Sequence, residues 1–304
     1  MTTFTIHGKV PGTGIGQTKV FGLLVDREFM FSNHREKYKP RVEKRQRKLI
    51  TQISFIRPFL EPDETILLVT TGHSPPTVLE KLGIGWLFIY LKRSLLIFTD
   101  RRIFHVPTTS TYRYRNSITQ IPYASCESIQ MKRANLVVEY RDGKGTEKFL
   151  SLSSREKKKI RELLKIISFE GPQRGVSRRV HLCPQCAKTM YRSISSCRAC
   201  GLKFKTGAAA TWLAILLPGG GYFYLRQPFL GFVTALLEIS AVVLIVISAG
   251  SLRDGVSPNF LWLGLGVLML GLIKPFAVVH ARVLAGEFVP RPRTVTFQAE
   301  AVEM

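Results

Sequence analysis

Cys183-Pro-Gln-Cys186 and Cys197-Arg-Ala-Cys200 lie ten residues apart, just before the first long apolar stretch of the 304-residue chain. Residues 1–206 hold 38 Lys and Arg against 16 Asp and Glu, whereas residues 207–304 hold 6 against 5. Nearly all of the net charge of +23 therefore precedes the apolar stretch. Such a field favours anionic partners, which include lipid headgroups as well as nucleic acids. The cysteine pairs thus separate a basic half from an apolar half in a chain long enough for several domains.

The two Cys-x-x-Cys turns are typical of a metal site, because each tight turn can present two sulfurs to one ion. Their number and spacing do not form a secreted disulfide framework, which points to a reducing compartment. Four thiolates leave no open position for water or substrate, so we predict a structural Zn²⁺ rather than a catalytic one. The predicted ligands are Cys183, Cys186, Cys197 and Cys200. Residues 182–204 resemble the zinc-ribbon family, in which Gly201 fits the second turn and Ala187 replaces the glycine often found in the first.

Two apolar stretches, Phe229 to Gly250 and Phe260 to Val279, each contain the roughly 20 residues that a helix needs to cross a bilayer. The flanks outside both stretches carry the basic residues Arg226, Arg282, Arg291 and Arg293. Because basic flanks stay in the cytoplasm, we expect a transmembrane hairpin whose two ends both face the cytoplasm.

A third apolar segment, Gly207 to Leu225, is interrupted by Pro218-Gly219-Gly220-Gly221, which cannot continue a straight helix at low cost. We predict a short interfacial or re-entrant helix here; the alternative is a kinked third span, which would place the C-terminus outside. The stretch from Leu217 to Tyr224 resembles the entry of bacterial membrane modules related to the TM2 domain. That resemblance implies a small helical membrane module and no known chemistry.

Glu238 lies well inside the first predicted span, where an unpaired charge is costly. Lys274 on the returning helix would lie at a similar depth in an antiparallel hairpin. We predict that the two form an intramembrane pair; the alternative is a neutral Glu238 bonded to Thr234 or to backbone.

Short β-branched segments bounded by turns predict seven strands between residues 64 and 151. The predicted strands are Glu64 to Thr71, Ser94 to Thr99, Arg102 to Val106, Ser117 to Ile121, Glu127 to Lys132, Asn135 to Tyr140 and Thr146 to Ser151. An amphipathic helix from Arg155 to Ile167 follows, with Lys157, Lys158, Lys159 and Arg161 largely on its polar face. Seven strands closed by one helix form a small half-open barrel.

The stretch from Leu95 to Val106, followed by Ile121-Pro-Tyr-Ala-Ser-Cys-Glu-Ser-Ile129, resembles bacterial pleckstrin-homology and GRAM-like domains over about residues 60–168. The resemblance implies a pleckstrin-like barrel with a C-terminal helix that binds lipid headgroups or protein partners. It does not tell which, because the loop after the first strand holds an insert, Val78 to Lys92, that is either a buried segment or a membrane-surface contact.

The N-terminal arm contains a predicted helix from Pro40 to Ile56, which Pro58 should end. The run from His34 to Lys48 is strongly basic, and its side chains either form a solvated face or bind an anionic surface. The predicted anionic-surface contacts are Lys44, Arg45, Arg47, Lys48, Lys92 and Arg93.

The sequence therefore predicts a multidomain α+β membrane protein. Its regions are a basic arm and helix (1–59), a pleckstrin-like domain (60–170), a linker and zinc ribbon (171–206), a membrane domain (207–284) and a flexible tail (285–304). The N-terminus lacks a secretory signal, so residues 1–206 should be cytoplasmic and the chain should reside in a bacterial inner (plasma) membrane.

No catalytic constellation stands out among the six histidines, so we expect a non-enzymatic protein. The leading hypothesis is a membrane-anchored adaptor or sensor whose partners are membrane lipids and a protein. A membrane-tethered nucleic-acid-binding protein is the alternative, and a subunit of a transport assembly is the second alternative.

Overall fold

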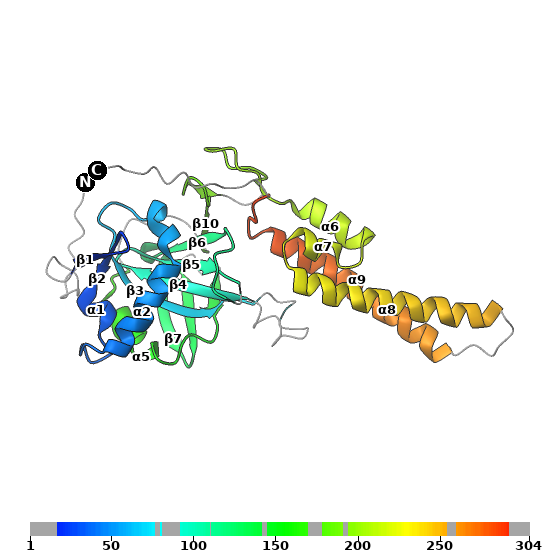
Figure 1. Cartoon of the computed structure of the whole chain (residues 1–304), viewed down its shortest axis with the longest axis horizontal. Coiled ribbons are helices and arrows are strands. Elements are labelled where there is room, and N and C mark those ends of the chain that lie inside the picture. The colour runs from blue at the N-terminus through cyan, green and yellow to red at the C-terminus, as the bar shows by residue number, and fades with distance from the viewer. Residues whose placement is uncertain are drawn as a thin grey trace. The chain divides into compact units, whose positions relative to one another are not determined.

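The computed structural model describes residues 17–76, 80, 92–109, 111–141, 145–169, 178–190, 194–253 and 260–291. The predicted insert at residues 78–92 lies mostly outside this described part, as do the first sixteen and last thirteen residues. The chain is a mixed α+β protein that divides into two units, Met1–Tyr191 and Arg192–Met304 (Figure 1). The first unit holds two sheets, and the second holds the apolar helices.

The larger sheet of the first unit has the strand order β1-β2-β3-β4-β5-β6-β10-β11. These strands are β1 Gln17–Val20, β2 Leu23–Asp26, β3 Ile66–His73, β4 Arg93–Thr99, β5 Arg102–Pro107, β6 Ile118–Pro122, β10 Val180–Leu182 and β11 Thr189–Met190. The smaller sheet consists of β7 Cys126–Lys132, β8 Asn135–Tyr140 and β9 Thr146–Phe149. The strand pairs of the described residues are antiparallel except β2 with β3, which run parallel.

All seven strands predicted between residues 64 and 151 are present, with bounds that differ by at most two residues at each end. Strand β5 is buried along its whole length because separate hydrophobic clusters cover the two faces of the sheet. The two sheets meet where His73 and Leu150 exchange backbone hydrogen bonds of 2.9 and 3.0 Å. Helix α5, Lys157–Ile166, follows β9 and buries Ile160 and Leu163 against the second cluster.

The N-terminal arm forms β1 and β2, helix α1 (Arg27–Phe31), helix α2 (Pro40–Gln52) and a 3₁₀ turn, η1 (Ser54–Phe59). Helix α2 is shorter than the predicted 40–56. The chain tightens into η1 because Pro58 has no N–H to donate to the carbonyl four residues earlier.

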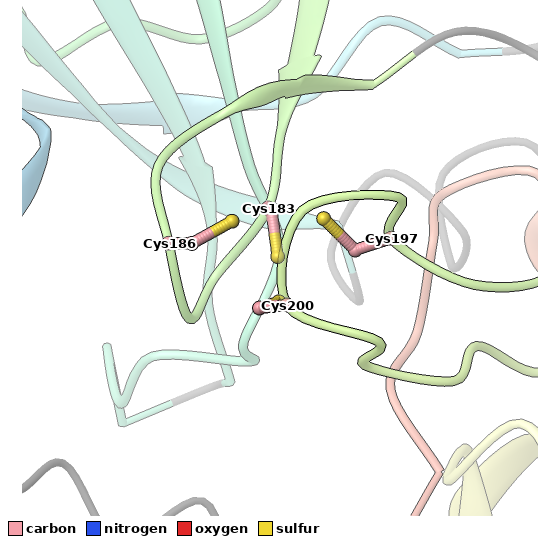
Figure 2. A group of neighbouring side chains, drawn as sticks. All are labelled: Cys183, Cys186, Cys197 and Cys200. Carbon is pink, nitrogen blue, oxygen red and sulfur yellow. The ribbon is translucent and has the colours of Figure 1, made fainter.

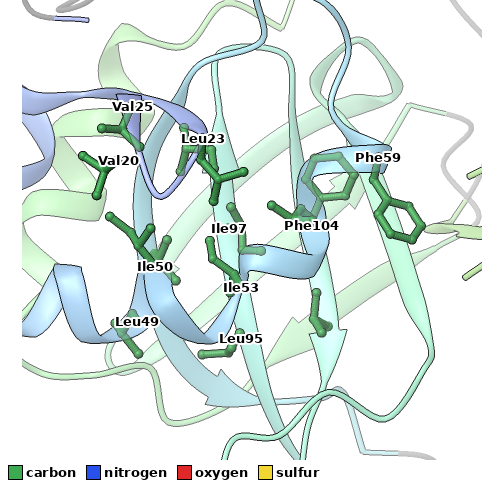
Figure 3. Close-up of a cluster of buried hydrophobic side chains, with 14 of the residues drawn as sticks. Val20, Leu23, Val25, Leu49, Ile50, Ile53, Phe59, Leu95, Ile97 and Phe104 are labelled. Atoms are coloured by element: carbon green, nitrogen blue, oxygen red, sulfur yellow. The ribbon is translucent and has the colours of Figure 1, made fainter. Parts of the chain in front are cut away.

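The arm is part of the main core, although the sequence predicted it as a separate region. Val25, Ile50 and Ile53 of the arm are fully buried in one cluster with Ile97 and Phe104 of the sheet (Figure 3). The Gln46 side-chain amide also accepts from Val69 N and donates to Val69 O, at 3.2 and 2.9 Å. Helix α2 thereby provides hydrogen-bond partners for the backbone of strand β3. The hydrophobic core continues across residue 59, where the sequence predicted a boundary.

The second unit consists of α6 (Gly207–Leu216), α7 (Gly220–Tyr224), α8 (Pro228–Arg253) and α9 (Phe260–Ala285). Two stretches, Pro228–Gly250 and Phe260–Ala285, are long and apolar enough to cross a membrane. Only 22% and 11% of the residues in their most apolar parts are buried, so apolar side chains line their outer surfaces. Helix α6 has 10 residues and spans about 15 Å, half of a bilayer core.

Candidate metal centre and buried ion pairs

The four predicted cysteine ligands come together in the structure. Their sulfur atoms all lie within 4.8 Å of one another, gathered from two turns (Figure 2). Tetrahedral Zn–S bonds of about 2.3 Å place sulfurs about 3.8 Å apart, so small adjustments would close the cluster on one ion. Four soft thiolate donors select zinc, copper(I) or iron over magnesium or calcium. The cluster is therefore a candidate metal centre, with Cys183 and Cys197 buried and Cys186 and Cys200 partly buried.

The two turns share one backbone design, and we call residues 183–188 the first knuckle and residues 197–202 the second knuckle. In the first knuckle, Cys183 N donates to Lys188 O at 2.9 Å, and Ala187 N donates to Cys183 O at 3.0 Å. The second knuckle repeats both bonds at 2.8 and 2.9 Å with each residue shifted by fourteen positions. These backbone bonds turn the chain so that the two cysteines of each knuckle lie close together.

Ala187 and Gly201 occupy the same place in the two knuckles and have positive φ angles of 56° and 71°. The left-handed region is strained for any residue with a Cβ and unstrained for glycine. Ala187, where the ribbon pattern often has glycine, therefore keeps the same turn but strains the backbone.

The two knuckles are supported by different neighbours. The first lies between β10 and β11, and β10 pairs with β6 at three register positions. The second is closed by the bridge of Ser196 to Lys203, and Phe204 then pairs with Pro290, which follows α9. Phe204 is 1% exposed and packs edge-on against Phe288 with ring centroids 5.6 Å apart.

The predicted pair of Glu238 and Lys274 is brought together, with Lys274 Nζ 2.8 Å from Glu238 Oε2. The carboxylate is 1% exposed. The same ammonium donates to Ala214 O and Ile215 O, at 2.9 and 3.2 Å, near the end of α6. Terminal carbonyls of a helix carry partial negative charge, so one cation stabilises both the carboxylate and the helix end. Lys274 thus connects α6, α8 and α9.

The six predicted anionic-surface contacts do not act as one set. Four of these side chains have partners within the fold: Arg45 with Glu156 at 2.6 Å, Arg47 with Glu43 at 2.8 Å, Lys92 with Glu80 at 2.7 Å, and Arg93 over the Tyr112 ring at 5.5 Å. Lys44 and Lys48 are exposed and have no ion-pair partner within the described ranges. Fewer of the predicted cations are therefore available to bind an anionic surface than the sequence suggested.

Lys159 was expected on the polar face of its helix, but its side chain is buried. Its ammonium donates to Phe29 O, Met30 O and Ser32 O at the end of α1. Burial lowers the pKa of Lys159 to about 8. The helical spacing offers no signal for this role, because the acceptors are carbonyls 127 to 130 residues away in the chain.

A buried Ser–His contact also escaped the sequence analysis. His105 Nε2 lies 2.8 Å from Ser74 Oγ, and Arg179 Nη1 donates to His105 Nδ1 at 3.2 Å. His105 Nδ1 also lies 3.0 Å from Thr119 Oγ1. Burial, together with the nearby positive charge of Arg179, holds the pKa of His105 well below its usual value, which favours the neutral ring.

Comparisons with known proteins cover family models, curated proteins and solved structures. The resemblances to a pleckstrin-like domain, a zinc ribbon and a TM2-related module rest on the quoted motifs. No family model, no curated protein and no solved structure matches this chain.

Proposed function

We propose that this chain is a non-enzymatic, membrane-anchored adaptor or sensor. Its apolar helices hold it in a bacterial inner membrane, and residues 1–206 face the cytoplasm. Its sheet unit binds a protein partner or anionic lipid, and Zn²⁺ at the four cysteines stiffens the chain between sheet and helices.

The observation that carries the proposal is the exposure of two apolar helices of 23 and 26 residues. A soluble protein would cover such surfaces, because exposed apolar area of this extent drives association. Large apolar side chains are exposed along both helices, including Phe232, Leu236, Val246, Leu261 and Leu272. Arg226 and Arg291 flank the helical hairpin on its outer ends, which supports a cytoplasmic position for both.

The arrangement of the first unit supports a binding role. Strands β3 to β6 follow one another in the larger sheet, β7 to β9 form the second sheet, and α5 comes after them. This order is the one expected of a pleckstrin-like domain, which serves as a binding module in the family that the sequence resembles. The charge of the chain favours anionic partners, and Lys44 and Lys48 are available on α2.

A structural role for zinc is supported by the ligand set. Four sulfurs complete a tetrahedral shell, so the ion would have no site left for substrate. A metal bound by all four would close the chain from Cys183 to Cys200 into one rigid loop.

The proposal is tested with the full chain in its membrane. Alkaline carbonate extraction should leave the protein in the membrane pellet, and purified protein should contain one zinc per chain. Release by carbonate would contradict the anchor.

The binding role is tested with the chain in neutral nanodiscs. If the partner is anionic lipid, the chain should be retained on added vesicles that contain phosphatidylglycerol, and this retention should fall with salt and in the double variant Lys44→Glu plus Lys48→Glu. If the partner is a protein, one copy of it should co-purify with each chain. The absence of both vesicle binding and a co-purified protein would overturn the proposed binding role. Tighter retention on duplex DNA or RNA than on vesicles would overturn it in favour of a membrane-tethered nucleic-acid-binding protein.

A further inference from the structure

The tip of the hairpin formed by β1 and β2 carries an aromatic side chain in an unfavourable backbone conformation. Val20 pairs with Leu23, so Phe21 and Gly22 form a two-residue loop. Their φ angles are +52° and +75°, as in a type I′ turn, which requires positive φ at both central residues. Asn, Asp and Gly suit the first of these positions, whereas a bulky residue there is strained.

Phe21 is also 60% exposed, so the fold gains little packing from it. The residues on either side hold the hairpin instead: Val20 and Leu23 are 7% and 1% exposed and point into the main core (Figure 3). A single exposed aromatic residue is ordinary on a protein surface. An exposed aromatic residue that also strains the backbone is not explained by stability, and such outliers tend to mark functional sites.

The charges beside this tip indicate its partner. Lys19 is exposed two residues before the loop, and a Cβ at Gly22 would lie 3.7 Å from Arg57 Nη1. Arg57 is exposed, and neither cation has an ion-pair partner in the described part of the chain. An aromatic side chain among unpaired cations matches the interface of an anionic bilayer, where rings lie at headgroup level and cations attract phosphates.

We propose that the Phe21 tip is a second membrane contact: Phe21 inserts among the headgroups of an anionic bilayer, and Lys19 and Arg57 bind lipid phosphates. This inference rests on the proposed membrane anchor, which keeps the first unit within reach of a bilayer. The contact adds no chemistry; it sets how the first unit is held when anionic lipid is present.

The test places a photoreactive benzoylphenylalanine at position 21 of the full chain in nanodiscs. A matched control carries the same group at position 38, because Tyr38 is equally exposed, at 57%. Illumination should yield lipid adducts at position 21 in discs with phosphatidylglycerol, and fewer in purely neutral discs. Since each cation near an anionic surface changes the equilibrium about fivefold, Lys19→Gln should lower the adduct by about that factor.

Two variants separate binding from folding. Phe21→Asn relieves the backbone strain, so it should raise the melting temperature. It also removes the ring, so anionic discs should no longer protect residues 17–26 from hydrogen exchange. Phe21→Ala removes the ring without relieving the strain, so it should lose the protection without the stabilisation.

Equal adducts at positions 21 and 38, adducts to a second protein chain, or a melting temperature that falls in Phe21→Asn would each overturn the proposal. Carbonate extraction reads the anchor independently. A chain that stays in the membrane but shows no adduct at position 21 therefore refutes only this inference.

Discussion

The first cysteine knuckle is built into a sheet, whereas the second is held by isolated bridges. Strand β10 joins the first knuckle to β6 over three residue pairs, so its backbone is in place before metal binds. The second knuckle has the bridge of Ser196 to Lys203 and the contact of Phe204 with Pro290. The same turn is therefore supported by a continuous strand ladder in one case and by isolated backbone bridges and the packing of Phe204 in the other. Metal binding should order the second knuckle more than the first.

The largest effect should come from removing the metal. Structural zinc in small sites contributes apparent free energies of about 10–16 kcal/mol at pH 7, and replacing either cysteine pair by serine should abolish stoichiometric zinc. Chelation should then deprotect residues 194–206 in hydrogen exchange far more than residues 180–190, because the β10–β6 ladder survives. Equal deprotection of both segments would break the comparison.

A matched pair of core truncations tests whether the two knuckles differ in their support. Phe204→Ala and Leu182→Ala each remove a buried side chain next to a knuckle, at a cost of about 3–5 and 2–5 kcal/mol respectively. Phe204→Ala should weaken zinc affinity strongly, because Phe204 is the buried side chain that packs this segment against Phe288. Leu182→Ala should lower the thermal stability of the sheet but change zinc affinity less. Competition with a chromophoric chelator measures the affinities, and the reverse order would contradict this account.

Exchanging the residues at the left-handed positions tests the turns themselves. Gly201→Ala should destabilise its knuckle by roughly 1–2 kcal/mol, and Ala187→Gly should relieve a similar strain. No heavy atom lies within 4 Å of a Cβ built at Gly201, so backbone strain alone is measured there. The readout is zinc affinity of each single variant and of the double variant. Two effects of the same sign would show that the turns are not equivalent.

The smallest effect should depend on pH. Lys205 follows the second knuckle and donates to Tyr224 O, and burial, with a contribution from Arg226, lowers its pKa to about 8. Between this value and the unfolded value near 10.5, the unfolded chain holds a proton that the folded chain lacks, so stability rises with pH. Lys205→Met should lack that rise. The measurement is amide hydrogen exchange of wild type and variant between pH 8 and pH 10. We expect the difference in protection between the two proteins to grow with pH in residues 194–206 and to stay constant in residues 180–190.

Local patterns predicted much of this molecule. Strand periodicity located β3 to β9, apolar length located α8 and α9, and cysteine spacing located the four-cysteine cluster, because each depends on neighbouring residues. The pair of Glu238 and Lys274 followed from helix depth.

Features that depend on distant partners escaped the sequence. Lys159 looked like a solvated residue, since its acceptors belong to α1. The arm looked separate because its short strands carry few residues, and its role in the core depends on where β3 lies. The strain at Phe21 is a property of the turn that Val20 and Leu23 impose, which no local propensity reveals.

The ion pair in the apolar unit has a consequence for how the chain enters a membrane. A lone helix carrying Lys274 would meet the bilayer with an uncompensated cation, at a cost of about 2.5–3.5 kcal/mol on insertion scales. A lone helix carrying Glu238 would face the same problem with the opposite sign. In the proposed membrane anchor, we therefore expect each span to act as the insertion partner of the other, so that the hairpin enters the bilayer as a pair.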